Sequence, residues 1–385
     1  MKLTFLFEFL SRGASWLRLI IISALVSPED YSLVILVVSA EALFGSVIAY
    51  PHIRETLYGQ QGGLTQLWNA VILFLVLSPI VFGFSYWYFA DVGVAVVVLV
   101  STLFFALYQI SMYVLRIGKL SSYNRTKLIS SVLATAIFLF FVPKGMIFLP
   151  IVSFSAFLVS IYVILKAIPP HEWWPKKLDG IYKSWLVYGV QSLSVNAWQY
   201  GNRFLVGFIF TAAQTAIFLK TYLIASGITF YLAAMMVVYE KHLSKKLADG
   251  ELGKRLSSAG KILFLIIGGV ALYYISVVAF LQLGGKDIEI IRDLLESVDV
   301  SLLCVFAGLF VVRAIQLVLN PIVIASGRRV ISLQASIVAM FVQFSLFLLF
   351  WEMLTLNWIA FIMVISQVLL VAYLWFKGIG KIGQA

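Results

Sequence analysis

The sequence predicts an all-α polytopic membrane protein with about 12 transmembrane helices. Of the 385 residues, 62% are hydrophobic and only 12% are charged, and the mean hydropathy is +1.02. The apolar residues recur in runs of roughly 20, the length of helix that crosses a hydrocarbon core about 30 Å thick. A soluble domain could not bury this much apolar surface.

Twelve apolar runs follow one another along the chain, separated by short polar turns. The first is expected to be retained as a span, because it carries charges at its middle, lacks a small-residue cleavage site and precedes further spans. The predicted spans are residues 3–26, 31–50, 64–88, 92–115, 123–142, 145–165, 184–210, 213–238, 261–283, 299–325, 330–350 and 354–376.

The loop charges predict the orientation of the chain. Of the 28 lysines and arginines, five lie well inside spans, and three, Lys144, Lys286 and Arg292, lie in loops on one side. The remaining 20 lie on the other side, which the positive-inside rule assigns to the cytoplasm together with both termini. The net charge of +11 is therefore an orientation signal and does not indicate a nucleic-acid partner.

The spans divide six and six around the middle of the chain. We expect an N-terminal lobe over residues 1–170, a cytoplasmic amphipathic connector over 171–183 and a C-terminal lobe over 184–385. A shift of 185 residues superimposes Arg18 on Arg203, each followed by an apolar run and a short turn. Two related lobes around a central site are a common plan of transporters.

When the charges near the ends of the spans are counted with the loops, seven charged residues remain inside predicted spans, where ionisable side chains are costly and face a polar interior. They are Arg12, Arg18, Arg203, Lys220 and Arg313, with the acids Glu8 and Glu41. Five positive and two negative charges leave a net charge of +3. We therefore predict a cationic cavity at the centre of the protein.

Polar residues at helical spacing accompany three of the arginines, as residues three or four apart share a helix face. The stripes are Ser11, Ser15 and Arg18; Ser192, Asn196, Gln199 and Arg203; and Arg313, Gln316 and Asn320. Such stripes line water-accessible cavities more readily than they face lipid. We predict that Ser11, Asn196, Gln199 and Gln316 bind substrate together with the five cations.

Structural roles compete with these functional ones. Arg12 either binds substrate or pairs with Glu8 one turn away. Lys220 either faces the cavity or extends its four-carbon side chain to the membrane surface. Glu41, like Glu8, is either the packing partner of an arginine or a protonatable group that couples transport to H⁺ or Na⁺. The bend expected at Pro321 is either a hinge or a static kink.

A cationic cavity in an apolar protein is suited to an anionic substrate, because guanidinium groups bind phosphate oxygens bidentately. No catalytic constellation competes with this prediction. The three histidines, His52, His171 and His242, fall in predicted loops, and the single cysteine, Cys304, excludes an internal disulfide framework. There is no metal cluster and no nucleotide-binding motif, so we expect neither a cofactor nor an enzymatic activity.

Two stretches resemble the MOP superfamily, and within it the Wzx-type O-antigen and polysaccharide flippases. They are SRGASWLRLIIISALVSPEDYSLVILVVSA before the PHIRE loop, and YGVQSLSVNAWQYGNRFLVGFIFTAAQTAIFLKTYLIASG. The pair Ser11-Arg12 followed by Arg18 is also similar to the first helix of lipid II flippases. Those flippases often have two further spans, which favours the Wzx type here.

The resemblance implies a flippase that uses alternating access in the bacterial inner membrane. Its substrate would be an undecaprenyl-diphosphate-linked oligosaccharide, and other polysaccharide-assembly membrane proteins are implied partners. Diphosphate recognition carries over to Arg12, Arg18 and, after the second span, Arg54. Two alternatives stay open: a MATE-like exporter, which would need an acidic cavity, and a membrane-integral polysaccharide polymerase or ligase acting on the same lipid-linked substrate.

Overall fold

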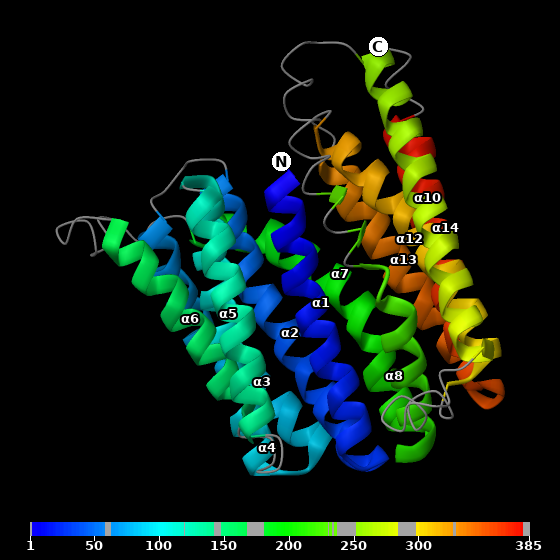
Figure 1. Cartoon of the computed structure of the whole chain (residues 1–385), viewed down its shortest axis with the longest axis horizontal. Coiled ribbons are helices and arrows are strands. Elements are labelled where there is room, and N and C mark those ends of the chain that lie inside the picture. Colours follow the sequence, from blue (N-terminus) through cyan, green and yellow to red (C-terminus); the bar gives the residue numbers. More distant parts are fainter. Residues whose placement is uncertain are drawn as a thin grey trace. The chain divides into compact units, whose positions relative to one another are not determined.

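The computed structural model describes residues 2–57, 63–118, 120–141, 148–167, 181–229, 231–232, 235–236, 252–283, 298–325 and 329–379. Almost all of these residues are helical (Figure 1). The α-helices are α1 (Lys2–Leu25), α2 (Pro28–Leu57), α3 (Gly63–Phe89), α4 (Val92–Gly118), α5 (Leu120–Phe141), α6 (Phe148–Ala167), α7 (Ile181–Ile209), α8 (Ala212–Ser226), α10 (Leu252–Leu283), α12 (Val300–Ala325), α13 (Arg329–Leu349) and α14 (Leu356–Tyr373). A 3₁₀ turn (Trp351–Met353) precedes α14 and a π-helical turn (Leu374–Ile379) follows it.

Each predicted span overlaps one of these helices, and the all-α, multi-pass membrane architecture is confirmed. The predicted eighth span, residues 213–238, is longer than α8, which ends at Ser226 because the hydrogen-bond pattern changes at Gly227. Eight helices of the described residues are long and apolar enough to cross a bilayer: α2, α3, α4, α6, α10, α12, α13 and α14. The others are α1, which carries four charged residues, α5, α7 and the 15-residue α8. The full number of twelve spans stays a prediction.

Several helices begin at a residue whose side chain accepts a backbone N–H of the first turn. Asp91 caps α4 through the N–H of Val94, and Thr355 caps α14 through that of Trp358. Thr211 forms a reciprocal capping box with Gln214 at the start of α8. Such caps satisfy N–H groups that have no partner within the helix, so these connections can be very short.

The contacts between helices divide the chain into two units. Unit 1 comprises Met1–Ser32 and Phe204–Ala385, and unit 2 comprises Leu33–Arg203. This division places α1 with the second half of the chain and most of α7 with the first half, whereas the predicted lobes divide the chain between the sixth and seventh spans. The predicted lobe boundaries stay a prediction.

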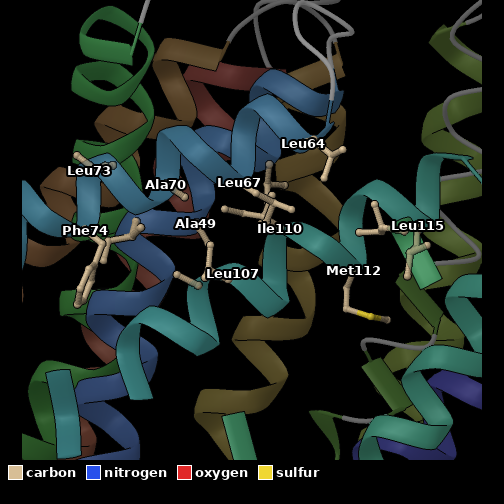
Figure 2. Close-up of a cluster of buried hydrophobic side chains, with 14 of the residues drawn as sticks. Ala49, Leu64, Leu67, Ala70, Leu73, Phe74, Leu107, Ile110, Met112 and Leu115 are labelled. Carbon is tan, nitrogen blue, oxygen red and sulfur yellow. The ribbon is translucent and has the colours of Figure 1, made fainter. Parts of the chain in front are cut away.

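In unit 2, α3, α4, α5 and α6 pack against one another in pairs. Their core is an apolar cluster to which α2, α3 and α4 contribute most of the side chains (Figure 2). Alanines such as Ala49, Ala70 and Ala106 are fully buried in this cluster. Small residues let membrane helices approach closely, and this packing replaces the hydrophobic driving force that is absent between helices in lipid.

In unit 1, α12 is the central helix, since it contacts α8, α10, α13 and α14. Aromatic rings fill its interface with α8, where Phe306 meets both Phe218 and Tyr222 edge to face. Helix α1 contacts α8 (Figure 1). This arrangement places the first helix, with its arginines, against a helix of the second half of the chain.

Candidate functional site

The predicted stripe on α1 is a connected chain of polar groups. The Ser15 hydroxyl donates to the carbonyl of Ser11 (3.1 Å), and Arg18 donates from Nη2 to the Ser15 hydroxyl (2.7 Å). Ser11 is buried, Arg18 is half-buried and Arg12 is exposed. Ser15 therefore orients the Arg18 guanidinium along its own helix.

Lys220 lies inside unit 1, with only 6% of its side chain exposed. Its ammonium group lies 5.6 Å from the centre of the Tyr31 ring, at cation–π distance. The adjacent Thr221 hydroxyl accepts the backbone N–H of Asp299, which ties α8 to the start of α12. Lys220 does not extend to the surface of the unit, and of the two alternatives for it the structure favours an interior position.

The stripe on α7 faces α2 at two points. The Ser192 hydroxyl donates to the carbonyl of Ser46 (3.0 Å) and accepts from the amide of Asn196 (3.0 Å). Asn196 also donates to the carbonyl of Ser192 (2.8 Å). Packing of α7 against α2, and not only exposure to a water-filled cavity, therefore explains why Ser192 and Asn196 lie at helical spacing.

Arg203 is half-buried at the other end of this stripe. It donates from Nη1 to the Ser39 hydroxyl of α2 (2.8 Å), and its guanidinium carbon lies 5.1 Å from the centre of the Tyr200 ring. Ser39 is fully buried and donates in turn to the carbonyl of Ile35. Two consecutive hydrogen bonds, from Arg203 to Ser39 and from Ser39 to the backbone, thus fix the position of this cation.

Glu41 is buried in unit 2, with 5% of its side chain exposed. The Ser153 hydroxyl of α6 donates to its Oε1. A carboxylate at this depth requires such donors, because burial penalises its charge. The contact joins α2 to α6 and makes Glu41 a packing partner of a serine, and it leaves open whether the acid also takes up a proton.

The polar residues of α12 form hydrogen bonds with the last two α-helices. Gln316 accepts from Gln367 of α14 (2.8 Å), and Asn320 accepts from Ser332 of α13 (2.6 Å). Arg313, one turn before Gln316, is half-buried. Pro321 lies inside α12, which continues to Ala325.

The predicted site residues are distributed over both units. Ser11, Arg12, Arg18, Lys220, Arg313 and Gln316 belong to unit 1, and Glu41, Asn196 and Arg203 belong to unit 2. The side chains of Glu8, Arg54 and Gln199 lie outside the described residues, as do the lysines and tryptophans of the predicted connector. A single cationic cavity formed by all of these residues remains a prediction.

An apolar cavity of about 290 Å³ lies elsewhere, between α3, α4 and α6. Its lining includes Leu67, Trp68, Leu107 and Ile161, and no predicted site residue. Among the described residues, no group of three or more His, Cys, Asp or Glu side chains is placed to hold a metal ion.

The sequence analysis missed the neutral partners of the charged residues. Ser39 and Ser153 hold Arg203 and Glu41, and Trp16 donates from its indole to the carbonyl of Leu223 on α8 (2.8 Å). Gln343 and Gln367, both fully buried, were also missed. The two glutamines carry the same signal as Gln316, a polar residue in the middle of an apolar span, whereas serines in spans are too common to be informative.

Comparison with known proteins assigns the fold. Neither a protein-family model nor a curated protein matches the sequence. Solved structures match over almost the whole chain, and they define the class: the chain has the fold of MOP-superfamily transporters.

The particular structures are transporters of different substrates. Lipid II flippase MurJ in an inward closed conformation matches with a TM-score of 0.69 at 14% identity, over 98% of this chain and 87% of its own. An inward-facing multidrug resistance MATE transporter matches with a TM-score of 0.64 at 14% identity, over 97% of this chain and 95% of its own. A MOP transporter from Pyrococcus furiosus, whose reversed pocket polarity suggests a different function, matches with a TM-score of 0.64 at 15% identity, over 99% and 95%.

Proposed function

We propose that the protein is a flippase that moves a polyprenyl-diphosphate-linked oligosaccharide, such as an O-antigen repeat unit, from the cytoplasmic to the outer leaflet. The observation that carries the proposal is the excess of cations over acids in the interior of the predicted spans. There, the five cations Arg12, Arg18, Arg203, Lys220 and Arg313 outnumber the two acids Glu8 and Glu41. A site for a cationic drug would need the opposite balance.

The contacts of these cations suit a diphosphate. A guanidinium offers up to five N–H donors in a planar fork, which suits the several oxygens of a diphosphate. Ser15 accepts from Nη2 of Arg18, and Ser39 accepts from Nη1 of Arg203. A hydroxyl carries no charge, so these two hydrogen bonds orient the guanidinium groups and do not themselves cancel their charge.

In the proposed cycle, two lobes alternate access to the cationic site while the polyprenyl chain stays in the bilayer. The amides of Asn196, Gln199 and Gln316 would bind sugar hydroxyls. An H⁺ or Na⁺ gradient would supply the energy, with Glu41 or Glu8 as the protonatable group. The fold shared with a lipid II flippase supports a lipid-linked substrate, and other polysaccharide-assembly membrane proteins would be its partners in the inner membrane.

The test is complementation of a polysaccharide-deficient strain. We expect Arg18→Ala and Arg203→Ala to abolish surface polysaccharide while the folded protein persists in the membrane. Arg125→Ala is the matched control, because Arg125 is an exposed arginine near the start of α5. Normal polysaccharide in both test variants would refute the assignment of the site.

Two other functions are tested by reconstitution in vesicles. The buried acid Glu41 and the fold shared with MATE transporters favour, as a second candidate, an exporter of cations. A polymerase or ligase would use the same lipid-linked substrate but would lengthen or transfer the sugar chain. Purified protein that translocates labelled lipid-linked sugar without elongating it supports the flippase, whereas exchange of an organic cation for H⁺ or Na⁺ supports the exporter.

A further inference from the structure

Helix α8 is too short to cross a hydrocarbon core by itself. It has 15 residues, from Ala212 to Ser226, and so spans about 22 Å, less than the roughly 30 Å of a hydrocarbon core. At its end the N–H of Gly227 bonds the carbonyl of Ile224, three residues back (3.1 Å). The regular pattern of bonds four residues back stops here, and the carbonyl of Leu223 loses its partner in that pattern.

Three aromatic side chains from two other helices donate hydrogen bonds to consecutive backbone carbonyls at this break. The indole N–H of Trp16 on α1 donates to Leu223 (2.8 Å). On α10, the hydroxyl of Tyr273 donates to Ile224, and that of Tyr274 donates to Ala225 (2.8 Å). Leu223 also accepts the hydroxyl of Ser226 (2.8 Å), and Ile224 accepts the N–H of Gly227. The aromatic donors add to these local bonds and tie the break to α1 and α10, at a place where polar groups of a membrane protein need internal partners.

Gly227 makes room for two of these donors. A Cβ atom at position 227 would lie 2.2 Å from the Tyr273 hydroxyl and 3.2 Å from Cζ2 of Trp16. No other residue type fits this close approach without displacing Tyr273. The glycine, the tryptophan and the tyrosines therefore form one arrangement, which we term the α8 clamp: Trp16, Gly227, Tyr273 and Tyr274.

The clamp lies next to two of the cations. Helices α1 and α8 run antiparallel, because Ser32, soon after α1 ends, donates to the carbonyl of Ala212 at the start of α8, while Trp16 meets Leu223. Arg18 follows Trp16 by two residues and Lys220 precedes Leu223 by three. At about 1.5 Å per residue, the backbones of Arg18 and Lys220 thus lie within a few ångströms of the same depth.

We propose that Trp16 is a positioning residue, whose bond to Leu223 sets the axial register between the arginine-bearing α1 and the lysine-bearing α8. Because a side-chain N–H directed at one carbonyl permits a single register, whereas apolar contacts permit sliding, this bond fixes the depths of Arg18 and Lys220 together. Its consequence for substrate binding rests on the proposed function, in which both cations bind the diphosphate.

The first experiment measures the register without a ligand. In full-length protein with Cys304→Ser, spin labels at Leu10 on α1 and Gln214 on α8, both exposed positions, report the distance between the two helices along their axes. We expect Trp16→Phe, which keeps an aromatic ring but lacks the N–H, to broaden or shift the distance distribution. Trp351→Phe is the control, since Trp351 is a tryptophan 45% exposed outside the clamp.

The second experiment measures binding of farnesyl diphosphate to the same purified proteins. We expect Trp16→Phe to weaken binding roughly 3- to 10-fold, the scale of one net hydrogen bond. Lys220→Gln alone also weakens binding, and we expect Trp16→Phe to add less to it than to the wild type, because coupled residues are not additive. Full additivity of the two substitutions would contradict positioning through Lys220.

The two experiments separate the two proposals. An unchanged distance distribution in Trp16→Phe would overturn the positioning role, whatever the binding result. Farnesyl diphosphate that binds the wild type no better than Lys220→Gln and Arg18→Ala would refute the proposed anionic site, while the distance measurement would still decide the role of Trp16.

Discussion

Ser39 illustrates how a neutral residue places a charge inside a membrane protein. Its hydroxyl is fully buried, donates to Ile35 of its own helix and accepts from Arg203. A carboxylate in its place would hold the arginine more tightly but would cancel its charge. The same logic applies to Ser15 beside Arg18. A hydroxyl partner thus orients a cation without cancelling its charge.

Gly227 permits a test of the α8 clamp at a single atom. We expect Gly227→Ala to lower the melting temperature of the detergent-solubilised protein by several degrees, because the methyl group displaces Tyr273, breaks its hydrogen bond to Ile224 and disturbs the packing of α8 against α10. Gly268→Ala is the control: on α10, the added methyl group meets no atom within 4 Å, so its melting temperature should stay equal or rise slightly. Equal melting temperatures for both variants would contradict the close packing at Gly227.

The elements of this protein are delimited by their caps as much as by their apolar runs. Asp299 precedes α12 and accepts the N–H groups of Ser301 (2.8 Å) and Leu302 (3.1 Å) through Oδ1. Partial burial raises the pKa of Asp299, but the hydrogen bonds from the Ser301 hydroxyl and these two N–H groups outweigh it, so its pKa lies below the usual value. The cap is therefore strongest when the carboxylate is ionised.

The pH dependence of this cap follows from the direction of the shift. A lowered pKa in the folded state contributes stability above the unfolded value of about 3.9, and this stability is lost as the pH falls through the folded value. We expect Asp299→Ala to cost about 0.5–2 kcal/mol at neutral pH, and its deficit relative to the wild type to shrink below about pH 4. Melting temperatures measured from pH 7 to pH 3 test this.

Asp299→Asn is the matched control for the cap. Asparagine keeps the acceptor oxygen and lacks the ionisation, so its stability should lie near that of the wild type and should not follow the carboxyl titration. A deficit of Asp299→Ala that is constant over the whole pH range would contradict a contribution from the ionised carboxylate.

For the whole molecule, the distribution of loop charges predicts which side of the membrane each turn faces. In protein with Cys304→Ala, a cysteine in place of Ala213, exposed at the start of α8, should react with a membrane-impermeant maleimide added to intact cells. A cysteine in place of Ser121, exposed at the start of α5, should react only after the cells are opened, because the positive-inside rule places this end in the cytoplasm. The reverse pattern would invert the predicted topology and, with it, the direction of transport.

The same fold serves transporters with different pockets, so the fold alone does not select the substrate. The MATE and MurJ structures match this chain with TM-scores of 0.64 and 0.69 at 14% identity each. The feature of this chain that bears on the substrate is the net positive charge in the interior of its predicted spans, and this charge comes from a few side chains. The substrate must therefore be established by experiments on residues such as Arg18 and Arg203.

The sequence by itself determined the helices and their approximate limits, because apolar length and loop charge are local properties that each segment carries alone. It also located the charged residues, since an arginine in an apolar run is conspicuous. Only the tertiary structure decided their partners: Trp16 meets Leu223, Ser39 meets Arg203 and Ser153 meets Glu41. These partners lie more than 100 residues apart along the chain and are ordinary residues in their own segments. Hydrogen bonding between them depends on which helices pack together, and the residue pattern within one helix does not predict which helix becomes its neighbour.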